Sequence, residues 1–396
     1  MLLHPASWTI FSMFLPRRFL SVSFLSILAM IGLVLIERNL FGARYFSERA
    51  PKVELYNLWH AWIALSLSLA VVQGFTRDAA GFGAPVLRLA SGRELGICSA
   101  AWVLATLMAL AFVIDPLDFS LLAREDSLVE WTSALLIFVA SGFLAAAAAG
   151  QFRAALSGEG RLAFISAAVA ALLAAGFFVI GMEEISWMQR VFGFATPEAL
   201  LVLNKQQELN LHNISTGFSE LLYYAGSFVL LSLAPFIWLY LRTGVDLGRL
   251  QAFAPSLLVL VASAPMAAFN SDNWSMLPTQ MMAMTTVIML LVIADVALKA
   301  GHWREFILLT AAAILIVVIQ QLFVLKAADL VRLWDPTEYK ELFIALGLAI
   351  YGIEAWSRLR SHAETALVSV AGAKNENTPP GGEVLEVSRN GRSQAA

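Results

Sequence analysis

Charged residues and cysteine are what this sequence has least of. Only 14% of its 396 residues are charged and 59% are hydrophobic, whereas a soluble globular domain carries about 25% charged residues. The shortage of charge predicts a protein embedded in a membrane. Cys98 is the only cysteine and lies inside an apolar run, so the sequence offers neither a disulfide framework nor a cysteine-based metal site.

The sequence also lacks the short motifs that mark several common enzyme classes. It contains no HExxH, no GxSxG and no phosphate-cradling glycine loop, which excludes zincins, serine hydrolases with a nucleophile elbow and P-loop motors. It has five histidines, of which only His60 could accompany His212 by the predicted topology, and a packed histidine in an aromatic setting is the more common explanation for His60. The net charge of −3 gives no reason to expect a nucleic-acid partner.

What the sequence has in abundance is long apolar runs. A run of about 20 residues crosses the hydrocarbon core of a membrane as a helix, and unbroken apolarity without period-2 alternation excludes a β-barrel. We therefore predict an all-α polytopic transmembrane bundle of about ten spans. The expected spans are 20–36, 55–74, 95–114, 129–149, 162–182, 217–241, 251–269, 277–298, 305–325 and 338–357.

The basic residues predict an orientation for this bundle. Lys and Arg are denser in the loops that share a side with the N-terminus, which places both termini in the cytoplasm by the positive-inside rule. We expect a multi-pass protein of the bacterial inner (cytoplasmic) membrane, with a transmembrane domain over residues 1–360 and a disordered cytoplasmic tail over 361–396. With this topology, acidic residues from several loops fall on the outer face.

Polar residues gather between the fifth and sixth expected spans, in residues 181–215. A short helix is expected to begin near Pro197. It is too short to cross the membrane, so we expect it to be interfacial or re-entrant. If the helix of span five continued, Glu183, Ser186, Trp187 and Arg190 would share one polar stripe and Glu184 would lie on the apolar side. We therefore expect Glu183 to be the interior carboxylate, since a carboxylate inside a bundle marks a functional site or an ion pair.

Two further groups complete the predicted site. Asn204, Glu208 and His212 follow one another at helical spacing, which would suit a metal-ligand pair or a general acid–base pair, and Glu208 and His212 also fall together if the segment is extended. Asp126 and Glu130 lie one turn apart at the start of the fourth span. The predicted catalytic residues are Glu183, Glu208, His212, Asp126 and Glu130; the predicted substrate-binding residues are Trp187, Gln189, Arg190, Asn204 and Asn210; and a divalent metal, if used, would be held by Glu183, Glu208 and His212.

Two segments carry a resemblance to a known family. EEISWMQRVFGFATPE with NKQQELNLHN, and EDSLVEWTSALL, resemble the signatures of a family of uncharacterised bacterial and archaeal polytopic membrane proteins, E-E-x-S-W-x-Q-R and N-x-Q-x-E-x-N-x-H-N. Met188 stands where that pattern usually has glycine. A looser likeness is to CAAX-type intramembrane glutamate proteases, although Arg190 comes two residues late for their EExxxR motif and their histidine motifs are missing. GT-C glycosyltransferases share the span count and the outer-face acids.

The acids, the histidine and the amides on one face favour an enzyme. The predicted function is a membrane-embedded hydrolase or transferase that acts on an amphiphilic or lipid-linked substrate at the outer face, with membrane lipid as the main partner. Two alternatives use the same residues. A proton- or cation-coupled transporter would line its path with these acids, and a non-catalytic envelope scaffold would use them for assembly.

Overall fold

A computed structural model describes residues 17–41, 55–79, 91–124, 127–201, 209–210, 216–241, 247–270, 277–330 and 337–376. Over these residues the chain is helical and has no strand. Ten helical segments are long and apolar enough to cross a membrane, and each coincides with a predicted span. The predicted all-α polytopic bundle is therefore confirmed.

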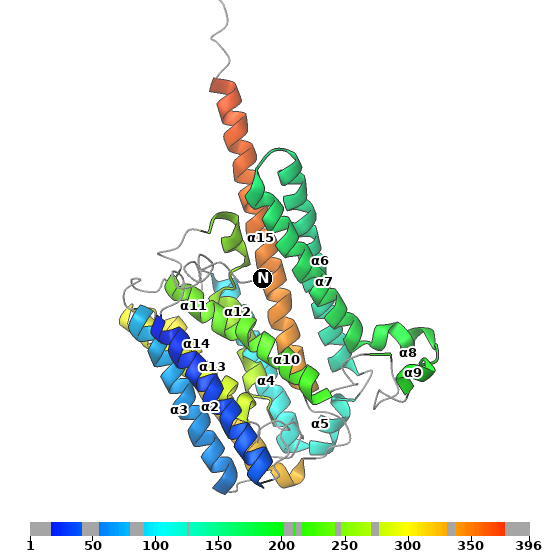
Figure 1. The fold of residues 1–396 in the computed structure, drawn as a ribbon, viewed down its shortest axis with the longest axis vertical. Helices are drawn as coiled ribbons and strands as arrows, with labels where there is room; N and C mark the ends of the chain where they lie inside the picture. Colours follow the sequence, from blue (N-terminus) through cyan, green and yellow to red (C-terminus); the bar gives the residue numbers. More distant parts are fainter. Residues whose placement is uncertain are drawn as a thin grey trace, which may run out of the picture.

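Three long helices form one side of the bundle (Figure 1). They are α6 (Leu128–Leu156), α7 (Arg161–Glu184) and α15 (Glu338–Glu376), and α6 packs along both of the others. The alanine-rich faces of α6 and α7 let the backbones approach closely, as helices in lipid require. α15 extends past the predicted domain boundary at residue 360 and continues beyond the bundle to Glu376; residues 377–396 lie outside the described residues.

The remaining helices fill the centre and the opposite side. α12 (Leu257–Ser263) lies at the centre between α4, α11 and α15, and the 3₁₀ turn η6 (Ala264–Ala267) extends it. The span that contains it is the most buried of the ten, at 72% of its residues. The helices of the other side and their connections are α2 (Arg17–Phe41), α3 (Leu55–Ala79), α4 (Gly92–Ile114), α5 (Pro116–Leu122), α13 (Leu277–Lys299), α14 (Trp303–Leu325) and the 3₁₀ turn η7 (Ala327–Asp329).

The sixth span is a helix with a wide turn in its middle. α10 (Thr216–Phe228) and α11 (Ala234–Leu241) are joined by the π-helical turn η4 (Val229–Leu233). Pro235 follows this turn, and a proline removes the amide hydrogen that would bind the carbonyl one turn earlier. Widening to a π turn accommodates the missing bond without breaking the span.

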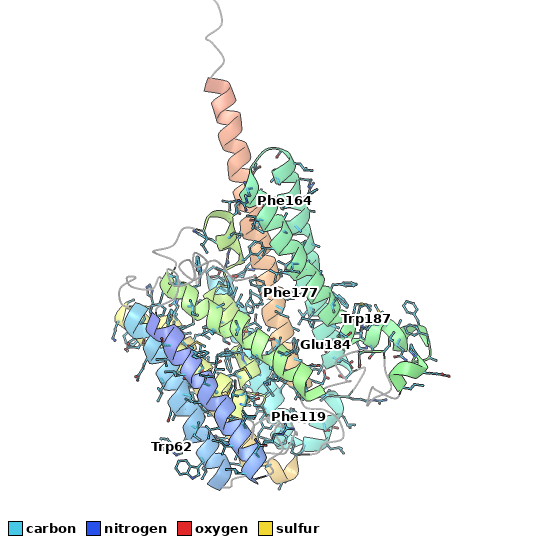
Figure 2. The ribbon with its side chains drawn as sticks, viewed as in Figure 1. Trp62, Phe119, Phe164, Phe177, Glu184 and Trp187 are labelled. Atoms are coloured by element: carbon cyan, nitrogen blue, oxygen red, sulfur yellow. The ribbon has the colours of Figure 1, made fainter. Side chains whose placement is uncertain are left out.

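Exposed tryptophans mark the surface of the bundle. Trp59 and Trp62 near the start of α3 and Trp303 at the start of α14 are 64%, 67% and 60% exposed, and Trp62 points away from the bundle (Figure 2). Amphipathic rings of this kind favour the membrane–water interface. Their exposure agrees with a bundle whose outer surface faces lipid.

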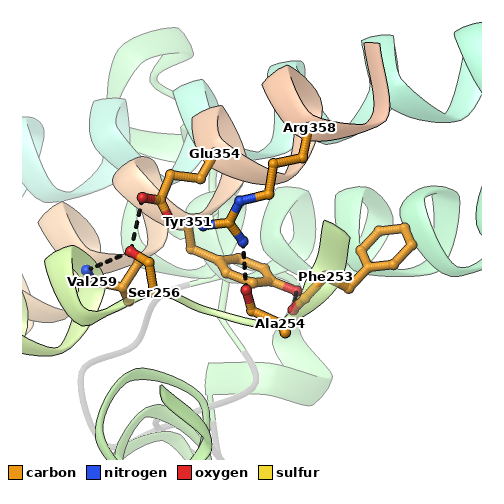
Figure 3. A network of polar contacts seen from close by, with 7 residues as sticks. All are labelled: Phe253, Ala254, Ser256, Val259, Tyr351, Glu354 and Arg358. Carbon is orange, nitrogen blue, oxygen red and sulfur yellow. Dashed lines mark hydrogen bonds and ion pairs between the residues drawn. The ribbon is translucent and has the colours of Figure 1, made fainter. Parts of the chain in front are cut away.

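A polar network joins α15 to α12 and to the 3₁₀ turn η5 (Gly248–Phe253), as Figure 3 shows. Ser256 donates to Glu354 at 2.8 Å, Arg358 donates to the same carboxylate at 2.9 Å, and Tyr351 donates to the Phe253 carbonyl at 3.1 Å. Arg358 also donates to the Ala254 carbonyl at 2.5 Å. These bonds fix α15 against the central helices away from the site described below.

Candidate functional site

The polar stretch after span five begins with a break in the helix. α7 ends at Glu184, and Ser186, Trp187 and Met188 follow with φ of 45°, 54° and 63°. Three consecutive non-glycine residues in this left-handed region are rare, and such conformations concentrate at functional sites. The chain then forms the short helix α8 (Gln189–Phe192), ends it at Gly193 with φ 65°, and starts α9 (Glu198–Leu201).

This break corrects the predicted polar stripe. Because the helix stops at Glu184, residues 183–190 do not share one helical face. Glu183 accepts a hydrogen bond from Trp187 Nε1 at 2.7 Å. Glu184 interacts with α6, α10 and α15, and Figure 2 shows it at the end of α7 while Trp187 lies in the loop toward α8.

Two of the predicted substrate-binding residues hold this loop together. The side-chain amide of Gln189 donates to Thr196 Oγ1 at 2.6 Å and to the Phe194 carbonyl at 3.2 Å, and its Oε1 accepts from the Leu209 backbone amide at 2.6 Å. Asn210, 2% exposed, donates to Ser186 Oγ at 3.1 Å. The segment at 209–210 is thereby tied back to the left-handed turn that follows α7.

Glu184 belongs to a cluster of carboxyl groups contributed by three helices, here called the carboxyl cluster: Glu130, Glu184, Glu338 and Glu341. Glu184 interacts electrostatically with Glu341 and Glu130, and Tyr223 of α10 interacts with Glu184, Glu338 and Glu341. Glu130 lies in the first turn of α6, and Glu338 and Glu341 in the first turn of α15. The bundle thus brings acids that are far apart in the sequence to one end, as the predicted topology required.

A tyrosine links this cluster to a buried lysine. Tyr224 donates from its hydroxyl to Glu341 Oε1 at 2.8 Å, and Lys340 Nζ lies 3.8 Å from the centroid of the same ring. Lys340 is 4% exposed and donates to Asn270 Oδ1 at 2.8 Å. The positive charge beside the cluster offsets part of its mutual repulsion.

Several predicted site residues lie outside the described residues. These are Asp126, Asn204, Glu208 and His212, and the side chain of Arg190. Among the residues that are described, no group of three His, Cys, Asp or Glu side chains is arranged to hold a metal ion. A divalent metal on Glu183, Glu208 and His212 therefore stays a prediction. His60 is buried within α3.

The site residues that the predicted set leaves out are Glu184, Glu338, Glu341, Tyr223, Tyr224 and Lys340. The sequence did indicate Glu341, because Glu338 and Glu341 form an acid pair at the start of a span, like the pair at the start of the fourth span. The two tyrosines carry no such signal in an apolar helix. Lys340 looks like an ordinary loop cation in the sequence, and only packing shows that it is buried.

The fold and these contacts define a polytopic α-helical membrane protein with a carboxyl cluster at one end of its bundle. No family model, curated protein or solved structure matches the chain. The resemblance of the two sequence signatures therefore brings no activity with it, and the site must be interpreted from its own chemistry.

Proposed function

We propose that this protein is a membrane-embedded hydrolase or transferase that acts on an amphiphilic or lipid-linked substrate, with Glu184 and Glu341 as its acid–base pair. The observation that carries the proposal is the meeting of these two carboxyl groups at one end of the bundle, where α7 ends and α15 begins. Neighbouring carboxyl groups disfavour each other's ionised form, which favours a proton on one of them. A pair that shares a proton provides an acid and a base in the same site.

The two carboxyl groups have different surroundings, which supports different roles. Glu341 lies in the first turn of α15, where the helix dipole favours a negative charge, and it accepts a hydrogen bond from Tyr224,. Glu184 is the last residue of α7, where the dipole disfavours a negative charge,. We assign Glu341 as the base and Glu184 as the acid.

The position of the pair supports an amphiphilic substrate. Both carboxyl groups lie at the ends of membrane-spanning helices, so a substrate must bring a reactive polar group to the level at which these helices end. A lipid-linked molecule does so while its chain remains in the bilayer. The orientation predicted from the basic residues places this end on the outer face of the bacterial inner membrane, where Glu208 and His212 would join the same site.

The proposal can be tested by the lipid composition of cells. We expect Glu184→Gln and Glu341→Gln, expressed at wild-type levels, to change one amphiphile in the same direction, because each removes one member of the pair while keeping its shape. Glu354→Gln is the matched control, since it makes the same change in α15 about 20 Å from Glu341 along the axis at 1.5 Å per residue. Mass spectrometry of extracted lipids measures the effect.

The outcome that contradicts the proposal is a lipid profile for both site variants that equals that of the wild type. An equal change in all three variants would also contradict it, because it would trace the effect to a loss of α15 packing.

A further inference from the structure

A small cavity lies beside the carboxyl cluster, between α10, η6, α13 and α15. Its volume of about 20 Å³ is enough for one small polar group. Most of its wall is apolar and its few polar groups converge, as in sites that bind part of a larger ligand. Its lining residues include Phe228, Met266, Asn270, Thr279, Met282 and Lys340.

Thr279 gives this cavity an unsatisfied hydrogen-bonding group. Its side chain is 1% exposed and its Oγ1 has no hydrogen-bond partner among the described residues. A buried hydroxyl without a partner is destabilising, and buried polar groups in proteins are satisfied with few exceptions. The hydroxyl of Thr286, which also lines the cavity, donates to the Met282 carbonyl at 3.0 Å, so the two threonines differ in this respect.

The charge around the cavity is positive on the side of Lys340. Lys340 lines the cavity, and its ammonium group donates to Asn270, which also lines the cavity, and lies over the Tyr224 ring. Thr279 and Lys340 both lie in the first turns of their helices, α13 and α15, where the helix dipole favours a negative ligand. The Tyr224 hydroxyl binds Glu341, so this ring connects the cavity to the carboxyl pair.

We propose that this cavity binds an anionic oxygen of the substrate head group, a phosphate or a carboxylate, with Thr279 and Lys340 as the donors. The proposal deepens the proposed function and rests on it for the identity of the ligand as the substrate. It narrows the substrate class from any amphiphile to an anionic one. Binding at the cavity would hold the head group next to Tyr224 and within reach of Glu341.

Thr279→Val is the decisive variant. Valine has the shape of threonine without the hydroxyl, and the Thr279 hydroxyl makes no bond that folding would lose. Thr285→Val is the matched control, because Thr285 lies on the same helix and its buried hydroxyl donates to Ser68 at 2.9 Å, away from the cavity lining. The full chain is purified in dodecyl maltoside, and its thermal unfolding is followed with dodecyl phosphate or inorganic phosphate added.

We expect dodecyl phosphate to raise the unfolding midpoint of the wild type and of Thr285→Val, and inorganic phosphate to leave it unchanged. Thr279→Val should bind dodecyl phosphate about ten-fold more weakly, as expected for the loss of one hydrogen bond to a charged group, while the unliganded variant unfolds no earlier than the wild type. Lys340→Met should also weaken binding. Because this lysine is buried, its replacement is more liable to disturb the fold than Thr279→Val.

Equal binding of dodecyl phosphate by the wild type and Thr279→Val would overturn the inference, and so would stabilisation by inorganic phosphate to the same extent. Glu184→Gln separates this test from that of the proposed function. It should keep the binding of dodecyl phosphate, so a failure of the cavity and a failure of the acid–base pair give different results.

Discussion

A close approach between the backbones of two spanning helices, α6 and α15, gives a sharp prediction. A Cβ atom added at Gly352 of α15 would lie 2.8 Å from the Ala140 carbonyl oxygen and 2.9 Å from its Cα atom. Ordinary contact begins at 3.4 Å, so Gly352→Ala requires α6 and α15 to separate by about 0.6 Å, the difference between 3.4 and 2.8 Å. The contacting atoms belong to the backbone of α6, which cannot relieve the clash by changing rotamer as a side chain can.

The expected magnitude follows from two opposing effects. Overpacking of this kind costs about 1–3 kcal/mol, and replacing glycine by alanine inside a helix returns about 1 kcal/mol. Gly352→Ala should therefore lower the free energy of unfolding by up to about 2 kcal/mol. Gly142 lies on the exposed surface of α6, with nothing within 4 Å of a Cβ atom added there. Gly142→Ala should therefore gain the helix propensity of alanine without overpacking.

The assay is reversible unfolding of the two variants in mixed detergent micelles, followed by circular dichroism. Since α6 carries Glu130 and α15 carries Glu341, spin labels on these two helices would show whether their separation also widens at the carboxyl cluster. The reasoning is refuted if Gly352→Ala is as stable as Gly142→Ala, because the close contact between the two backbones would then carry no cost.

Three further predictions concern buried polar groups and the left-handed turn, all measured as the change in free energy of unfolding. Gln280→Met should stabilise the protein by about 1–3 kcal/mol, because both polar atoms of this buried side chain lack partners among the described residues,; a loss of stability would show that they are satisfied. Gln320→Met, the matched change on α14, should destabilise it by about 1 kcal/mol, since Gln320 donates to the Ala267 carbonyl at 2.6 Å,. Met188→Gly should stabilise it by up to about 1 kcal/mol, because glycine adopts φ near +63° without strain,, and an unchanged or lower stability would argue against the left-handed turn.

The loop after α7 shows where sequence reasoning fails. The prediction of a polar stripe assumed that the helix continues past Glu184, and the left-handed residues 186–188 end it. Nothing local forbids helix in Ser-Trp-Met, so the turn depends on contacts made from a distance, such as that of Asn210 with Ser186. The structure places Glu184 in the carboxyl cluster, whereas the argument from a polar stripe favoured Glu183.

The sequence by itself determined that the protein is a helical bundle of about ten membrane-spanning segments, because the length and apolarity of each run are local properties that decide whether it can cross a bilayer. The alternating direction of consecutive spans also places the acids of several loops at one end. Only the tertiary structure decided which acids meet, because neighbouring residues on a helix differ by about 100° in direction and the rotation of each helix is fixed by its packing. Glu184 rather than Glu183, Tyr224 beneath Lys340, and Thr279 beside a cavity are all consequences of that packing.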